Sequence, residues 1–227
     1  MDVDYISLCL DKINSIYSDL LLTSNYCRKE QSISWNNYSP GIFSRVLYAK
    51  EYEQLIDGRQ YSFLLKDKSF FQFYYEFTDG VLTKAKLCFY PYPISNREDM
   101  EALEEYFCES GTDILETYYY GLKELQEMGV VSTNNSHFRF DYDHNVASHC
   151  KSHAQYGGIN DLRIPFNHII NPILFFEFIV KNAYDGYNSM KEVIENSDNY
   201  RHAMSLASQK YTQVSEENGI HLQYRAL

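Results

Sequence analysis

Residues 61–93 read YSFLLKDKSFFQFYYEFTDGVLTKAKLCFYPYP, and they predict the central part of the architecture. Aromatic and β-branched residues fill two runs, Phe70–Phe77 and Val81–Tyr90, which Thr78-Asp79-Gly80 connects. An Asp-Gly pair supplies the positive φ angles that a tight hairpin requires. A shorter run, Tyr61–Leu65, precedes them, and the prolines of the PYP ending stop the last strand because proline cannot donate to a ladder. The stretch therefore predicts an antiparallel β-meander.

Apolar residues recur at three- and four-residue steps on both sides of this meander, which is the spacing of amphipathic helices. The predicted helical segments are residues 4–22, 48–56, 96–108, 112–128, 172–184 and the polar stretch 187–217. Asn171-Pro172 is a strong helix start, since asparagine caps free amide groups and proline fits the first turn. Further strands are predicted at residues 137–143, 149–156 and 220–227. We expect a single α+β domain over residues 1–227, a curved antiparallel sheet of about five to seven strands packed by the helices at 4–22, 112–128 and 172–184.

Composition restricts the classes of protein. The five cysteines are scattered and lack CxxC spacing, which favours reduced thiols in a cytoplasm. The acidic N-terminal residues do not resemble an export signal, and no run approaches the roughly 18 apolar residues of a membrane helix. The net charge of −11 opposes broad DNA binding, because an acidic protein repels the polyanion, but leaves room for RNA at a local cationic site. The 22 tyrosines and 14 phenylalanines suit a packed core and also an interface, so we expect a protein partner or a homo-oligomer.

Four of the seven histidines lie between residues 137 and 153, among several charged side chains. If residues 137–143 and 149–156 form paired strands, Arg139 and Asp141 share one side, and His149, Lys151 and His153 share another. Pairing can bring both sets onto a common face accessible to water. Arg163, just before Ile164-Pro165, is a further candidate for binding an anion. Three interpretations of this cluster stay open.

The first interpretation is a metal site. His149 and His153 are four residues apart, which on a helix places the two imidazoles about 6 Å apart. The surrounding serines and glycines argue against a helix, and on a strand the same spacing is about 13 Å, too far to share one ion. Cys150 would then face away from His149. A single histidine with Asp141, Asp143 or His137 stays possible, but we predict no metal and no cofactor.

The second interpretation is metal-independent acid–base chemistry. Imidazoles titrate near neutrality, so His149 and His153 are the acid and base candidates. Arg139 and Lys151 can hold a phosphate and stabilise a pentacovalent oxyanion, and Asp141 can orient one imidazole. Such a set cleaves RNA through its 2′-hydroxyl. The third interpretation is structural, since alternating charged and aromatic residues are what any half-exposed antiparallel strand shows.

The meander and the later blocks FRFDYD, SHCKSHAQYGG and LRIPFNHIINPILFFEFIVKNAY resemble the bacterial "domain of unknown function 2290" family over nearly the whole chain. Two positions depart from the expected pattern. Lys68 stands where we expect glycine in the Asp-x-Ser turn, and Leu87-Cys88 where we expect leucine-alanine. The resemblance implies a small prokaryotic cytoplasmic protein and carries no established activity. The Arg-x-Asp-x-Asp strand followed by a histidine-rich strand is also similar to TumE-type toxins.

The two resemblances imply a bacterial cytoplasmic protein of the antiphage defence or toxin–antitoxin class. Its site would be lined by His149, His153, Asp141, Arg139 and Lys151, with Arg163 as an anion holder, and RNA or another phosphodiester would be the substrate. The alternative is a non-catalytic interaction subunit of a multi-protein defence complex. The acidic balance and the lack of a complete catalytic motif favour that alternative.

Overall fold

The structure, a computed structural model, describes residues 1–40, 47–96, 108, 130–132, 134, 136–157, 162–184, 186–209 and 212–214. Five helices lie in these ranges: α1 (Val3–Ile16), α2 (Tyr48–Asp57), α6 (Pro172–Ala183), α7 (Tyr187–Glu195) and α8 (Asp198–Gln209). No helix of the described residues is long and apolar enough to cross a membrane. The predicted α+β class and the single domain are confirmed.

An antiparallel sheet of nine strands forms the centre of the molecule, in the order β1-β4-β5-β6-β9-β10-β11, with β3 added to β5 and β2 to β3. The strands are β1 (Leu21–Ser24), β2 (Tyr26–Arg28), β3 (Ser32–Trp35), β4 (Phe63–Leu65), β5 (Phe70–Thr78), β6 (Val81–Tyr90), β9 (Phe138–Asp143), β10 (Ser152–Tyr156) and β11 (Ile164–Pro165). Two small ribbons pair β7 (Ile94–Asn96) with β8 (Val130–Ser132), and β12 (His168–Ile169) with β13 (Thr212–Gln213). The nine strands exceed the five to seven that we predicted.

The meander is confirmed as β4, β5 and β6. Asp79 and Gly80 have φ angles of 51° and 77°, the left-handed pair that a two-residue hairpin turn needs. The preceding turn places Lys68 at φ 69°, in the same left-handed region. The absence of glycine there is thus a departure with a conformational cost, since a Cβ disfavours that region.

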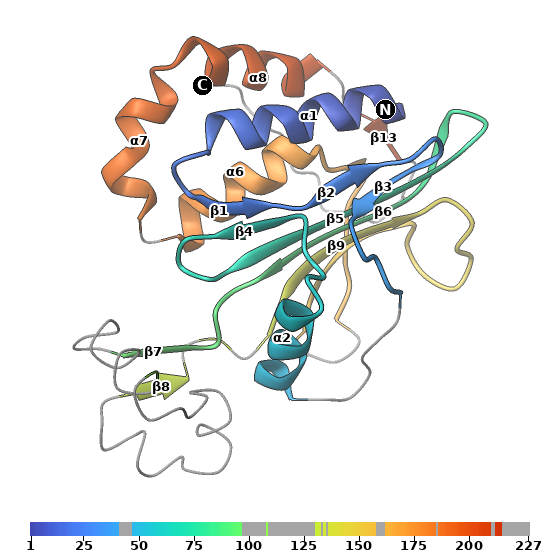
Figure 1. Ribbon diagram of the computed structural model, residues 1–227. Helices are drawn as coiled ribbons and strands as arrows, with labels where there is room; N and C mark the ends of the chain where they lie inside the picture. Colours follow the sequence, from blue (N-terminus) through green and yellow to red (C-terminus); the bar gives the residue numbers. More distant parts are fainter. Residues whose placement is uncertain are drawn as a thin grey trace.

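Helices cover both faces of the sheet (Figure 1). On one face, α1, α6 and α8 pack over the larger core, and Phe71, Phe140 and Phe176 within it are fully buried. On the other face, α2 covers one end only, where Tyr52 packs on Phe70 with ring centroids 5.3 Å apart. The rest of that face carries polar side chains, and this half-covered face holds the candidate site.

Local chemistry accounts for the helix starts. The Asp2 side chain accepts from the backbone N–H of Tyr5 at 2.8 Å, and the Asn171 side chain accepts from the N–H of Ile173 at 2.8 Å. Both are N-caps that satisfy amides lacking a partner inside the helix. The predictions of α2 and of the helix at 172–184 are confirmed.

Three predicted elements are corrected. The helix at 4–22 ends at Ile16, because Leu21–Ser24 extends to pair with β4. The strand at 149–156 begins only at Ser152, because residues 144–151 form the connection from β9. The stretch 187–217 is helical through α7 and α8, but Thr212–Gln213 forms β13. The predicted helices at 96–108 and 112–128 and the strand at 220–227 lie outside the described residues, apart from Asn96, which ends β7, and Cys108.

Candidate functional site

The pairing of β9 with β10 sets the geometry of the polar face. Their register places His153 opposite Asp141 and Gln155 opposite Arg139, so these four side chains share one face. Phe140 and Tyr142, at the alternate positions of β9, are buried in the core on the other face. The strand therefore separates an aromatic side from a charged side, as its sequence predicts.

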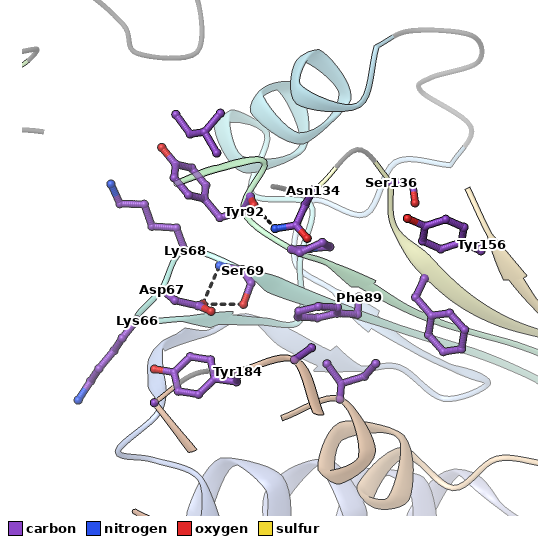
Figure 2. A pocket seen from close by; sticks show the side chains of 16 residues that line it. Lys66, Asp67, Lys68, Ser69, Phe89, Tyr92, Asn134, Ser136, Tyr156 and Tyr184 are labelled. Atoms are coloured by element: carbon purple, nitrogen blue, oxygen red, sulfur yellow. Dashed lines mark hydrogen bonds between the residues drawn. The ribbon is translucent and has the colours of Figure 1, made fainter. Parts of the chain in front are cut away.

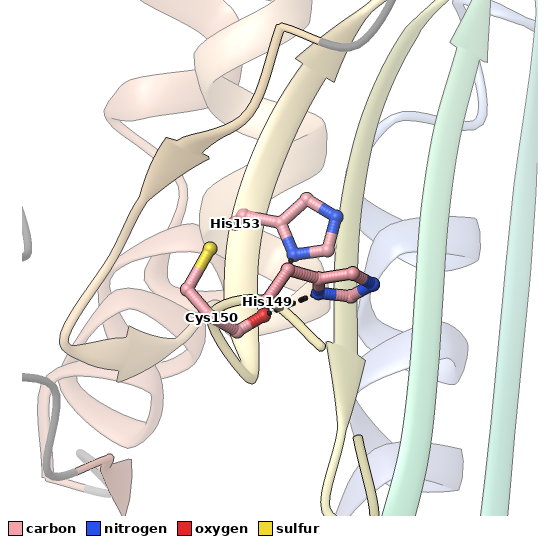
Figure 3. Close-up of side chains that lie close together, drawn as sticks. All are labelled: His149, Cys150 and His153. Carbon is pink, nitrogen blue, oxygen red and sulfur yellow. Dashed lines mark hydrogen bonds between the residues drawn. The ribbon is translucent and has the colours of Figure 1, made fainter. Parts of the chain in front are cut away.

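The connection between the two strands brings His149 back over His153. The backbone N–H of Asp143 donates to the carbonyl of Lys151 at 2.9 Å, which closes the loop and puts His149 outside the strand. The two imidazole rings lie with their centroids 5.0 Å apart, close to perpendicular (Figure 3). The predicted separation of about 13 Å assumed one continuous strand and is wrong.

One carbonyl oxygen holds both imidazoles. The Nδ1 atoms of His149 and His153 lie 2.9 Å and 3.2 Å from the carbonyl oxygen of Cys150. A carbonyl only accepts, so in each ring Nδ1 carries the proton and donates it, which leaves Nε2 as the basic nitrogen. His149 is exposed, so its Nε2 is accessible from solvent.

His153 has a different environment, because it is only 3% exposed. Its Nε2 lies 2.9 Å from the side-chain nitrogen of Gln155, which donates to it, and 3.7 Å from Asp141 Oδ2. Burial lowers the pKa of His153 and outweighs the opposing effect of the Asp141 carboxylate. The ring is therefore neutral near pH 7, with both nitrogens engaged.

Arg139 and Asp141 form the polar centre beside these rings. Arg139 Nε lies 2.7 Å from Asp141 Oδ2, and the Arg139 guanidinium also donates to Gln155 Oε1. The second carboxylate oxygen, Asp141 Oδ1, is buried and has no hydrogen-bond partner among the described residues. The pair thus orients Gln155 and, through it, His153.

The exposed cations lie around this centre. Lys86 is the register partner of Asp141 on the neighbouring strand β6 and is exposed. Arg163 is exposed just before β11, and Lys151 is half-buried just before β10. The sequence did not single out Lys86 or Gln155. Side chains alternate between the two faces of a strand, so both residues could have been placed on the polar face once the register was known.

His149, Cys150 and His153 can also hold a metal ion. One ligand atom from each lies within 4.8 Å of the others. Tetrahedral zinc has bonds of about 2.0–2.3 Å, so these atoms would have to approach each other by roughly 1 Å. The prediction that Cys150 faces away from His149 assumed a continuous strand, whereas in the loop its Sγ atom lies within 4.8 Å of the imidazole nitrogens. The donor set itself, two imidazoles and a thiol, suits zinc.

A second buried group lies on the same face, under α2. Tyr90 donates through its hydroxyl to Glu51 at 2.9 Å, and His137 Nδ1 lies 3.9 Å from the same carboxylate. Burial, helped by the charge of Arg139, lowers the pKa of His137 to about 4, and burial raises the pKa of Glu51. The contact is therefore not an ion pair at neutral pH. Nothing in the sequence around Glu51 indicated this position.

Because the pKa of His137 is lowered, we expect the protein to lose stability in acid. The pKa of about 4 lies below the ordinary 6.5, so as the pH falls the unfolded chain takes up the proton before the folded protein does. The stabilisation is complete above pH 6.5 and is lost between pH 6.5 and 4. We expect this group to lower the free energy of unfolding by about 2 kcal/mol between pH 7 and pH 5, measured by urea unfolding.

The control variant is His137→Asn, which removes the titrating ring. Between pH 7 and pH 5, the free energy of unfolding of this variant should fall by about 2 kcal/mol less than that of the wild type. Changing the exposed His202 on α8 to Asn should leave the wild-type fall unaltered. Glu51 works in the opposite direction, because a raised carboxyl pKa favours the folded state in acid. Equal acid losses in wild type and His137→Asn would contradict the assignment.

Comparison with known proteins gives one match. A family model described as "Uncharacterized conserved protein (DUF2290)" matches residues 18–224. No curated protein and no solved structure matches the chain. The similarity to TumE-type toxins thus stays a prediction.

Proposed function

Because the chain belongs to the DUF2290 family of uncharacterized conserved proteins, whose description names no activity, we propose a function from the side chains around His149. The protein binds and cleaves a phosphodiester, with RNA as the substrate, by metal-independent acid–base chemistry. Its cellular role is in antiphage defence or a toxin–antitoxin pair. The observation that carries the proposal is the exposed imidazole of His149, 5.0 Å from the buried His153.

Proton transfer is assigned to His149 alone. Its Nδ1 is held by the Cys150 carbonyl, so Nε2 can take the proton of a 2′-hydroxyl. The 2′-oxygen then attacks phosphorus, and the 5′-oxygen leaves with a proton from the imidazolium, giving a 2′,3′-cyclic phosphate. His153, predicted as a second acid or base, is better suited to positioning, because both of its ring nitrogens are engaged.

Cations stabilise the charge of the pentacovalent phosphorane. Arg163 and Lys151 keep the anion-binding role that the sequence predicts, and Lys86 joins them from β6. Arg139 contributes through Asp141 and Gln155, which it holds in place. The carboxylate of Asp141 keeps the predicted orienting role, but it acts on His153 at 3.7 Å rather than on the exposed ring.

The test uses a labelled single-stranded RNA. We expect His149→Ala to slow cleavage by about 10²-fold, the usual contribution of one acid–base group. His202→Ala, an exposed histidine on α8, is the matched control and should leave the rate unchanged. The products should carry 2′,3′-cyclic phosphates, and a substrate with deoxyribose at the cleavage point should survive. Cleavage that is equally fast in His149→Ala, or no cleavage by the wild type, rejects the proposal.

A second candidate, a zinc-dependent reaction at the same place, is favoured by the clustering of His149, Cys150 and His153 within 4.8 Å. The same assay separates the two. If neither EDTA nor Cys150→Ser reduces cleavage, the metal-independent reaction is supported. If both abolish cleavage, the zinc-dependent reaction is supported. A protein partner or a homo-oligomer remains a prediction that co-purification from the native host would check.

A further inference from the structure

A cavity of about 790 Å³ lies at the opposite end of β9 from Asp143 and the histidine loop. It is bounded by the β4–β5 turn, the segment after β6, the C-terminal end of α6, and Asn134, Ser136 and Phe138 (Figure 2). Its volume falls in the range of small-molecule sites, about 300–1,000 Å³. None of its lining residues belongs to the His149 cluster, so it is a separate site.

The walls of the cavity are aromatic. Phe89 and Phe138 line it from neighbouring strands, where they are register partners, and Tyr92, Tyr156 and Tyr184 line it from three other segments. Rings that approach from several directions provide flat apolar surfaces, which suit a planar ring system better than a flexible chain.

A buried hydroxyl marks the polar end. Ser136 lines the cavity and is 6% exposed, and its Oγ atom has no hydrogen-bond partner among the described residues. Leaving a buried hydroxyl unpaired costs free energy, so such groups are uncommon without a reason. A polar atom of a bound molecule would satisfy it.

The rim carries positive charge in an acidic protein. Among the described residues that line the cavity, the charged ones are Lys66, Asp67 and Lys68, from the β4–β5 turn. Asp67 is turned to Ser69, whose N–H and hydroxyl donate to its Oδ1 at 2.9 Å and 2.6 Å. Asp67 keeps its negative charge, so two ammonium groups face one carboxylate and these three side chains together carry a net positive charge.

Lys68 occupies this rim despite its backbone. Its φ of 69° is the left-handed region that favours glycine, and its Nζ lies 5.4 Å from the centre of the Tyr92 ring. Glycine at this position would remove the conformational cost of the left-handed backbone. It would also remove an ammonium group from the edge of an aromatic cavity. The Lys68 side chain thus connects the aromatic wall of the cavity with its positively charged rim.

We propose that this cavity binds a planar aromatic or heteroaromatic molecule with an anionic group, of the size of a nucleoside monophosphate. The ring lies among the tyrosine and phenylalanine side chains, the anion reaches Lys66 and Lys68, and a polar atom of the ligand pairs with Ser136 Oγ. The site does not depend on the proposed phosphodiesterase activity, because it shares no residue with that centre.

The test is titration calorimetry of the full chain with AMP, GMP, CMP and UMP, and with 4-hydroxybenzoate as an aromatic carboxylate. Adenosine and inorganic phosphate are the half-ligands. If a nucleotide binds, the anionic group that the site recognises is a phosphate. If only the benzoate binds, that anionic group is a carboxylate. Each half-ligand should bind at least tenfold more weakly than the whole. If no probe binds at millimolar concentration, the proposal is overturned.

Two variants distinguish binding from folding. Lys68→Gly and Ser136→Ala should each weaken binding at least threefold while leaving the melting temperature unchanged or higher, since one relieves the turn and the other removes an unpaired hydroxyl. Lys191→Ala, an exposed lysine on α7, is the charge control and should change neither. A lower melting temperature with unchanged binding in both variants would assign these residues a structural role and reject the site.

Discussion

Replacing Phe176 by alanine should lower the free energy of unfolding by about 3–5 kcal/mol, the range for deleting a fully buried phenylalanine. Phe176 is fully buried on α6, and its ring lies 4.4 Å from Phe71 and 4.8 Å from Tyr17, measured between centroids. The variant removes the side chain through which α6 contacts both the sheet and the N-terminal segment. Urea unfolding followed by circular dichroism measures the effect.

Phe178→Ala is the matched control, two residues further along the same helix. Phe178 is 56% exposed, so its removal should change the free energy of unfolding by no more than about 0.5 kcal/mol. Both changes raise the helix propensity by the same amount, because alanine is a better helix former than phenylalanine. An equal effect of the two variants would show that helix formation, not packing in the core, dominates the stability.

Lys181→Met should destabilise the protein by about 2–3 kcal/mol, somewhat less than the roughly 3–5 kcal/mol for a fully buried ion pair, because Lys181 is partly exposed. Its Nζ lies 2.7 Å from Glu177 and 2.9 Å from Glu195, while Glu177 is only 3% exposed. Without the lysine, the buried Glu177 carboxylate keeps the hydroxyl of Tyr200 but loses the ammonium group of Lys181. Urea unfolding at pH 7 measures the loss.

A double variant tests the reason for this loss. Changing both Glu177 and Lys181 to methionine removes the buried charge together with its partner, so it should be less destabilising than Lys181→Met alone. Lys191→Met, on the exposed side of α7, is the control for removing a positive charge and should have little effect. If the double variant is less stable than the single one, the electrostatic explanation fails.

Elements with local signals could be predicted from the sequence. The β5–β6 hairpin needs only Asp79-Gly80 and two long runs of strand-forming residues, and α6 needs only its asparagine cap and an apolar run. Strands such as β1 and β11 could not be predicted, because two to four residues outside a recognisable meander carry no usable periodicity. The helix at 4–22 was extended too far because apolar spacing continues to Leu20, which is buried in the turn after the helix.

The sequence indicates candidate residues for the site but does not fix how they lie relative to one another. Strand alternation alone places Arg139 and Asp141 on the polar face. The distance between His149 and His153 depends on the path of the loop after β9, where no local pattern fixes the backbone. Glu51 comes from a helix about ninety residues earlier in the chain, so its contact with His137 exists only in the folded protein.

Helix α1 is completed by contacts with residues that are synthesised much later. The Tyr5 hydroxyl on α1 donates to the carbonyl of Leu206 on α8, 201 positions later, and accepts from the Asn171 amide that caps α6. At a translation speed of about 5–20 residues per second, this helix leaves the ribosome roughly 10–40 s before its last contact appears. Until α6 and α8 have both emerged, its apolar face, with Ile6, Leu10 and Ile13, lacks part of its helical cover. Chaperones that protect nascent chains would therefore find an apolar target in α1.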